Sequence, residues 1–140
     1  MIIYCAGPIR GDVKYRKWLR EIIEHVAGEG HIALSELSDN FKSAMPLTDN
    51  QIFKRDIKWL EKSKAVIAEI SGASTGVGFE ISYALYKQQI PVLALANDKA
   101  ENASAMIEGC NSKLLTFKKY SGADDLKSIV SEFIKANSEG

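Results

Sequence analysis

The chain has 140 residues, the length of one domain, with 18 acidic and 18 basic side chains. Apolar residues make up 46% and charged residues 26%, as in ordinary globular domains with a substantial core. The zero net charge argues against a nucleic-acid polymer or an anionic membrane as partner, so phosphate recognition has to be local. No apolar run approaches the length of a membrane span, and we expect a single cytoplasmic domain over residues 1–140.

The sequence offers few residues for metal or redox chemistry. Cys5 and Cys110 form no metal-binding motif, which favours two reduced thiols. With His25 and His31 as the only histidines, no catalytic metal site is expected. The opening segment, MIIYCAGPIRG, lacks the basic stretch of a signal peptide and is typical of a first strand.

The first half of the chain alternates short apolar runs with helical patterns. Met1–Ala6 is an apolar run stopped by a Gly-Pro pair, which predicts a buried strand. Apolar residues recur at spacings of three and four over Tyr15–Val26, as on one face of a helix. His31–Ser35 predicts a second strand, and the polar stretch Glu36–Leu47 predicts a long binding loop. Thr48–Lys62 starts with a capping residue and predicts a second helix.

The second half continues the alternation. Ala65–Ile70 predicts a third strand, the Ser- and Gly-rich stretch Ser71–Gly76 predicts a turn, and Val77–Lys87 predicts the next helix. The remaining expected elements are a strand at Pro91–Ala96, a short helix at Ala103–Glu108, a strand at Leu114–Phe117, a helix marked by apolar residues from Leu126 to Ile134, and a frayed tail, Asn137–Gly140.

Strands that alternate with helices predict a doubly wound α/β fold, in which helices cover both faces of a parallel five-stranded sheet. Ligands of such sheets bind beyond the carboxyl ends of the strands, near the point where the strand order reverses. The loops expected to surround that point are Gly7–Val13, Glu36–Leu47 and Ser71–Val77.

Two carboxylates stand out by their positions. Asp56 falls on the apolar face of the second predicted helix, where an unpartnered carboxylate is costly. A functional group and a core Asp bonded to a backbone amide or an arginine are equally good interpretations of Asp56. Glu80 is expected in the first turn of its helix, where the helix N-terminus lowers its pKa and keeps it ionised. On position alone, compensation of the helix dipole is the simpler explanation for Glu80.

Other residues near the expected loops fit a site for a phosphate or a sugar. Gly76 and Gly78 would let a ligand approach the backbone, although they form only part of a dinucleotide-binding fingerprint. Tyr4 is either a core residue or a hydrogen-bond donor to a site carboxylate, and Arg10 is either a surface charge or an anion clamp. Two carboxylates and a tyrosine suit glycoside cleavage, which needs a carboxylate nucleophile and a second acid or base.

Five short motifs occur in order between residues 1 and about 109. They are YCAGPIRG at 4–11, DIKWL at 56–60, AEI at 68–70, STGVGFE at 74–80 and SAMI at 104–107. This ordered set resembles the 2'-deoxynucleoside 5'-phosphate N-hydrolases, which belong to the nucleoside 2-deoxyribosyltransferase superfamily.

The resemblance implies roles for individual residues. Glu80 matches the nucleophile, Asp56 the second catalytic carboxylate, and Tyr4 the tyrosine that positions the nucleophile. The substrate-binding residues that it implies are Ile9, Arg10, Gly11, Ser74, Gly76, Gly78 and Ser104. Among these, Arg10, Gly11 and Ser74 match residues of the 5'-phosphate site. Ser104 matches a serine supplied by the neighbouring subunit, so a homodimer is expected.

The implied reaction is hydrolysis of the N-glycosidic bond of 2'-deoxynucleoside 5'-monophosphates through a Glu80 glycosyl-enzyme. The expected products are the free nucleobase and 2-deoxyribose 5-phosphate, and no cofactor is needed. Two alternatives stay open. One is a deoxyribosyltransferase, which passes the sugar to a second base, and the other is a non-catalytic nucleotide-binding module.

Overall fold

The computed structural model describes residues 1–9, 14–38, 46–101 and 103–138. Within these residues, parallel strands form one five-stranded sheet in the order β2-β1-β3-β4-β5. The strands are β1 (Ile2–Ala6), β2 (Ile32–Leu34), β3 (Ala65–Glu69), β4 (Val92–Asn97) and β5 (Leu115–Tyr120). The predicted doubly wound α/β fold is confirmed, and the order reverses between β1 and β3.

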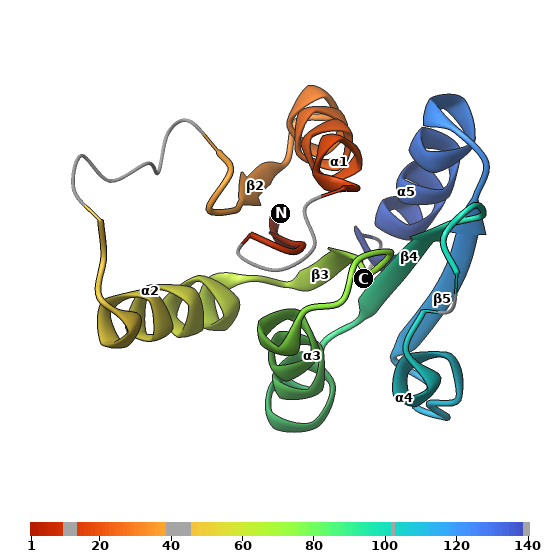
Figure 1. Ribbon diagram of the computed structural model, residues 1–140. Helices are drawn as coiled ribbons and strands as arrows, with labels where there is room; N and C mark the ends of the chain where they lie inside the picture. Colours follow the sequence, from red (N-terminus) through yellow and green to blue (C-terminus); the bar gives the residue numbers. More distant parts are fainter. Residues whose placement is uncertain (10–13, 39–45, 102, 139–140) are drawn as a thin grey trace.

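Helices cover both faces of this sheet (Figure 1). One face carries α1 (Arg16–Gly28) and α5 (Ala123–Ser138), and the opposite face carries α2 (Asp49–Lys62), α3 (Thr75–Ser82) and the short α4 (Ala105–Glu108). A π-helical segment, η2 (Tyr83–Gln88), continues α3. Because both faces are covered, every residue of β3 and β4 is buried, as is usual for central parallel strands. In the described parts of the chain, no helix is both long enough and apolar enough to cross a membrane.

A capping box fixes the start of α2 and thereby the position of Asp56 along it. The Thr48 side chain accepts a hydrogen bond from the Gln51 amide at 3.2 Å, and the Gln51 side chain accepts one from the Thr48 amide at 2.9 Å. These two bonds satisfy amides that the helix itself leaves without partners. The predicted cap at Thr48 is confirmed.

Several predicted boundaries are wrong. The helix expected from Val77 begins at Thr75, because the Ser74 side chain accepts from the Val77 amide at 3.2 Å and caps the helix two residues earlier. The strand expected to end at Phe117 continues to Tyr120, since an edge strand tolerates the two lysines that precede Tyr120. The tail expected to fray from Asn137 is helical through Ser138, and residues 139 and 140 lie outside the described residues.

A buried carboxylate links the ends of β3, β4 and β5. Glu69 is 0% exposed, and it accepts hydrogen bonds from the Ser71 amide at 2.6 Å, the Ser71 hydroxyl at 3.0 Å and the Tyr120 hydroxyl. The Ser71 hydroxyl oxygen in turn accepts from the Asn97 amide at 2.7 Å. Burial raises the pKa of Glu69, and these hydrogen bonds oppose the rise. The cluster therefore holds the turn after β3 against the neighbouring strands.

We expect Tyr120→Phe to lower the free energy of unfolding by about 1–3 kcal/mol, because it removes a donor from the buried Glu69 carboxylate. Tyr83→Phe is the matched control, since the Tyr83 hydroxyl contacts Glu61 at 3.5 Å at the surface. Its effect should stay within about 0.5 kcal/mol. Urea unfolding of both variants makes the comparison, and equal losses would contradict the role given to the Glu69 cluster.

Candidate active site

A cavity of about 670 Å³ opens at the carboxyl edge of the sheet, beside the strand reversal. The three predicted loops contribute to it: Gly7 and Ile9 come from the first, Glu36 from the second, and residues 73–77 from the third. Helix α2 adds Asp56, and helix α3 adds Glu80. Arg10 and Gly11 were also predicted here, but they lie outside the described residues.

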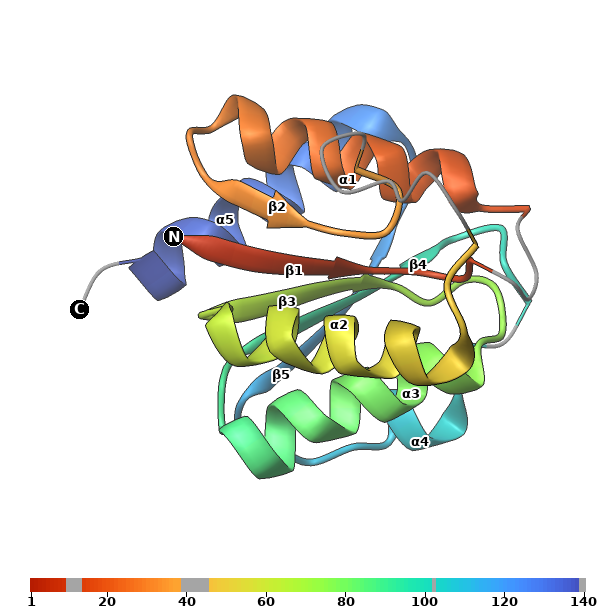
Figure 2. The ribbon, with the colours of Figure 1, turned by 90° about the vertical axis from the view of Figure 1, so that its left-hand side faces the viewer.

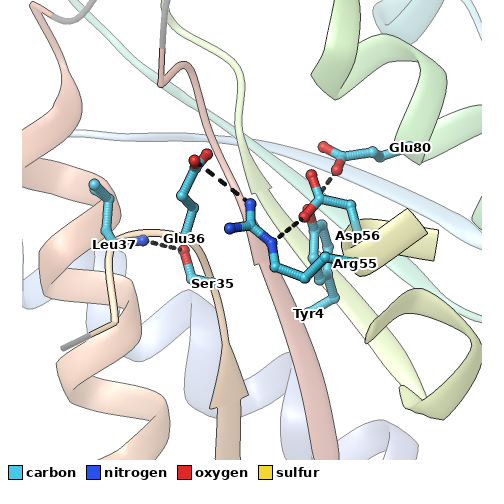
Figure 3. Close-up of polar contacts among 7 residues, drawn as sticks. All are labelled: Tyr4, Ser35, Glu36, Leu37, Arg55, Asp56 and Glu80. Carbon is cyan, nitrogen blue, oxygen red and sulfur yellow. Dashed lines mark hydrogen bonds and ion pairs between the residues drawn. The ribbon is translucent and has the colours of Figure 1, made fainter. Parts of the chain in front are cut away.

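Asp56 and Glu80 line this cavity, and the side chains of Tyr4, Asp56 and Glu80 point toward one another in Figure 3. Tyr4 lies on β1 and is buried, with 5% of its surface exposed. Its hydroxyl donates a hydrogen bond to Glu80 Oε2. The Asp56 carboxyl group lies beside the Glu80 carboxyl group, and both line this cavity. The fold thus brings together three residues that lie far apart in the sequence.

The protonation of Glu80 differs from the sequence-based expectation. Burial raises the pKa of Glu80 to about 8, the Tyr4 hydrogen bond opposes the rise, and the nearby Asp56 charge adds to it. The prediction that the helix N-terminus lowers this pKa is wrong. Glu80 is the sixth residue of α3 and lies beyond the first turn, where the helix dipole acts most strongly. Burial also raises the pKa of Asp56, and the adjacent Arg55 opposes that rise.

An arginine that sequence reasoning did not identify completes this polar group. Arg55 Nε donates to Asp56 Oδ1 at 3.0 Å, and its Nη2 lies 3.4 Å from a carboxylate oxygen of Glu36. Its guanidinium group also lies over the Trp59 ring, 4.6 Å from the centroid. The only signal in the sequence is that Arg55 directly precedes Asp56. Neighbours one apart on a helix rarely face each other, so that signal is weak.

The remaining predicted residues occupy two different places. Ser74 caps α3, and Gly76 and Gly78 follow it in the first turn. A Cβ at Gly76 would meet only the Ser74 hydroxyl, 3.9 Å away, and one at Gly78 would meet nothing within 4 Å. Ser74 and Gly76 line the cavity that holds Glu80. Ser104 does not line it: its side chain caps α4 and faces a second cavity of about 780 Å³ between α3, η2 and α4.

The rim of the first cavity is aromatic. Phe53 and Phe79 are 53% and 51% exposed, and their rings meet edge to face with centroids 6.0 Å apart. Both line the cavity that holds Glu80, so a flat apolar group can lie at its mouth while polar groups reach the carboxyl pair. Among the described residues, no cluster of His, Cys, Asp or Glu side chains is arranged to hold a metal ion.

The chain is similar to known proteins in sequence and in fold. Residues 3–125 match the family model for nucleoside 2-deoxyribosyltransferases. A candidate 2'-deoxynucleoside 5'-phosphate N-hydrolase from Methanosarcina barkeri is 40% identical over 96% of this chain and 85% of its own length. One from Thermofilum pendens is 34% identical over 89% of each chain. In fold, the chain is similar to a CMP N-glycosidase from Clostridium botulinum, with a TM-score of 0.70, 16% identity, and 95% of this chain and 99% of that chain covered.

The raised pKa of Glu80 makes a prediction about stability. A carboxyl with a pKa of about 8 when folded and about 4.5 when unfolded takes up a proton on folding, so its contribution to stability falls as the pH rises between those values. Glu80→Gln removes this dependence. We therefore expect the Tm of Glu80→Gln, minus that of the wild type, to grow by a few degrees between pH 5 and pH 8.5.

Thermal melts of both proteins at matched ionic strength measure this difference. Glu69 titrates in both proteins, so its contribution cancels in the comparison. A Tm difference that is constant with pH would show that Glu80 is ionised throughout this range.

Proposed function

The chain belongs to the nucleoside 2-deoxyribosyltransferase family, and from this premise we propose that it hydrolyses the N-glycosidic bond of 2'-deoxynucleoside 5'-monophosphates. The observation that carries the proposal is the half-buried pair of carboxyls, Asp56 and Glu80, with the Tyr4 hydroxyl bonded to Glu80. Two adjacent carboxyls that share one proton provide both a nucleophile and an acid, which are the two groups that glycoside cleavage requires.

In the first step, the pair uses its one proton and its one charge. The proton passes through Asp56 to the departing base, while the Glu80 carboxylate attacks C1' of the sugar. The C1'–N bond breaks with its electrons on the base nitrogen, and a C1'–O bond to Glu80 forms. The pair then holds no proton, and the neutral base leaves. The Tyr4 hydroxyl keeps the Glu80 carboxyl in one orientation throughout.

In the second step, water replaces Glu80. The Asp56 carboxylate takes a proton from the water as its oxygen attacks C1'. The electrons of the C1'–O bond return to Glu80, and 2-deoxyribose 5-phosphate leaves with retained configuration. The pair again holds one proton, so the cycle closes without a cofactor. A deoxyribose substrate suits this path, since losing the 2'-hydroxyl eases formation of the cationic transition state.

The phosphate of the substrate is assigned to the start of α3. Ser74 and Gly76 line the cavity there and leave the backbone approachable, whereas Gly78 lines the second cavity. The positive end of the helix favours an anion. Ile9 lines the same cavity. Arg10 and Gly11, which follow Ile9 in the sequence, are proposed for the same phosphate, in keeping with the charge-assisted bonds that arginine forms with phosphates.

The direct test is to incubate the protein with each of the four deoxynucleoside 5'-monophosphates and the matching nucleosides, and to chromatograph for free base. We expect base release from monophosphates, and we expect Glu80→Gln to lose at least about three orders of magnitude in kcat while it still binds the nucleotide. Tyr83→Phe is the control for folding, because it leaves the cavity unchanged.

Other outcomes of this experiment distinguish the alternatives. Base exchange that depends on an added acceptor base would make the protein a transferase. Tight nucleotide binding without any base release would make it a binding module. Release by Glu80→Gln at the wild-type rate would remove Glu80 from the nucleophile's role.

We also propose that the active unit is a symmetric homodimer in which Ser104 reaches the partner's phosphate site. Ser104 is exposed at the start of α4 and lies outside the cavity that holds its own Glu80. The surrounding surface is apolar, with Tyr86 66% exposed and Met106 83% exposed. Such a surface is typical of protein interfaces, and a two-fold axis would exchange the two serines reciprocally.

Mixing two variants tests this composite site. Glu80→Ala and Ser104→Ala chains are each impaired in a different part of the site, so a mixed dimer has one site with both lesions and one site with neither. We expect mixing to restore part of the wild-type rate toward monophosphates, with subunit exchange followed by native mass spectrometry. Exchange without any gain in rate would take Ser104 out of the shared site.

A further inference from the structure

Arg55 is placed to act on the carboxyl pair without belonging to the cavity. It is 18% exposed, and it does not line the cavity that contains Asp56 and Glu80. Its Nε points to Asp56 Oδ1, and its other end points away from the pair toward Glu36, as Figure 3 shows. The Trp59 ring supports the flat face of the guanidinium group. Arg55 is therefore held on three sides and presents one donor to one oxygen.

In this arrangement Asp56 and Glu80 have different hydrogen-bond donors, and the two donors differ in charge. Asp56 receives a charge-assisted hydrogen bond from Arg55, and Glu80 receives a neutral one from Tyr4. A cation next to one member of a coupled carboxyl pair stabilises the charge on that member, so the shared proton goes to the other. Burial raises the pKa of both carboxyls; Arg55 opposes the rise at Asp56, and the charge of Asp56 adds to the rise at Glu80.

We propose that Arg55 is a positioning residue that fixes Asp56 as the charged partner of Glu80, and that Glu36 weakens this effect from the loop after β2. The kinetic consequence rests on the function proposed above, whereas the charge of Asp56 can be measured without turnover. In the substrate-free enzyme, Glu80 is then protonated and Asp56 is ionised. That proton moves to Asp56, and on to the base, only when substrate occupies the cavity.

Glu36 provides the opposing charge. Its carboxylate lies 3.4 Å from Arg55 Nη2 and forms an ion pair with it. This contact is not a hydrogen bond, because Arg55 Nη2 has no hydrogen-bond partner. Its negative charge raises the pKa of both Asp56 and Glu80. The other ionisable groups around the pair are Tyr4 on β1 and Asp49 at the start of α2, which lines the same cavity. Neither of these carries a positive charge, so Arg55 is the cation that the described residues bring to the pair.

Two substitutions should therefore move the pH profile in opposite directions. Arg55→Gln removes a positive charge, so the pair binds protons more tightly, and the acid limb of kcat/KM should move up by about one pH unit. Glu36→Gln removes a negative charge, so the same limb should move down, and by less, because Glu36 is 34% exposed and water screens its charge. Arg55→Lys keeps the charge but loses the planar fork. It should therefore keep the limb near its wild-type position while kcat falls.

The charge itself is measured by carboxyl ¹³C NMR titration of the substrate-free protein, with the Asp56 signal assigned by its loss in Asp56→Asn. We expect the Asp56 midpoint to rise in Arg55→Gln and to fall in Glu36→Gln. Thermal melts of each variant confirm folding at every pH used.

Three results would overturn the proposal. One is an Asp56 midpoint that does not change in Arg55→Gln. Another is a shift of the same sign in Arg55→Gln and Glu36→Gln. The third is a loss of rate in Arg55→Gln that is equal at every pH, which is what a purely structural ion pair produces. If the wild type releases no base but the two midpoints move as stated, the proposed function fails and the role of Arg55 stands.

Discussion

The site depends on the partial burial of two carboxyl groups side by side. In water, Asp56 and Glu80 would both be ionised and would stay apart. In the cavity their two negative charges repel each other, and one shared proton lowers the electrostatic cost of holding them together. The pair forms because the fold places α2 and α3 side by side on the same face of the sheet, with α2 against β1 and α3 against β3 (Figure 2). Tyr4 on β1 then holds one carboxyl, and Arg55 on α2 holds the other.

Most of the fold could be predicted from the sequence, because its elements follow simple periodicities. The errors fall where side-chain hydrogen bonds override the local pattern. Ser74 starts α3 two residues before the apolar pattern does, and Tyr120 extends β5 past two lysines because its hydroxyl has a buried partner in Glu69. That partner lies 51 residues away, so no local rule could identify the pair.

The candidate site could be predicted only in part. Tyr4, Asp56 and Glu80 could be selected because a carboxylate on an apolar face is unusual and because the ordered motifs resemble a family. Their protonation could not be predicted, since the pKa of Glu80 depends on burial, which a sequence does not contain. The role of Arg55 could not be predicted for a related reason. The direction of its side chain depends on contacts with Glu36 and Trp59, and these contacts exist only in the folded chain.

The one-proton pair also decides which charged compounds suit the cavity. With its proton, the pair carries one negative charge, and without it the pair carries two. An inhibitor with a protonated amine in place of C1' attracts both carboxylates, so its binding drives the shared proton into solvent. The affinity of such an amine would rise with pH until the amine itself loses its proton. A neutral sugar analogue of the same shape would lack this dependence on pH. Isothermal titration calorimetry in buffers of different ionisation enthalpy would tell the two kinds of inhibitor apart, because only the amine releases a proton on binding.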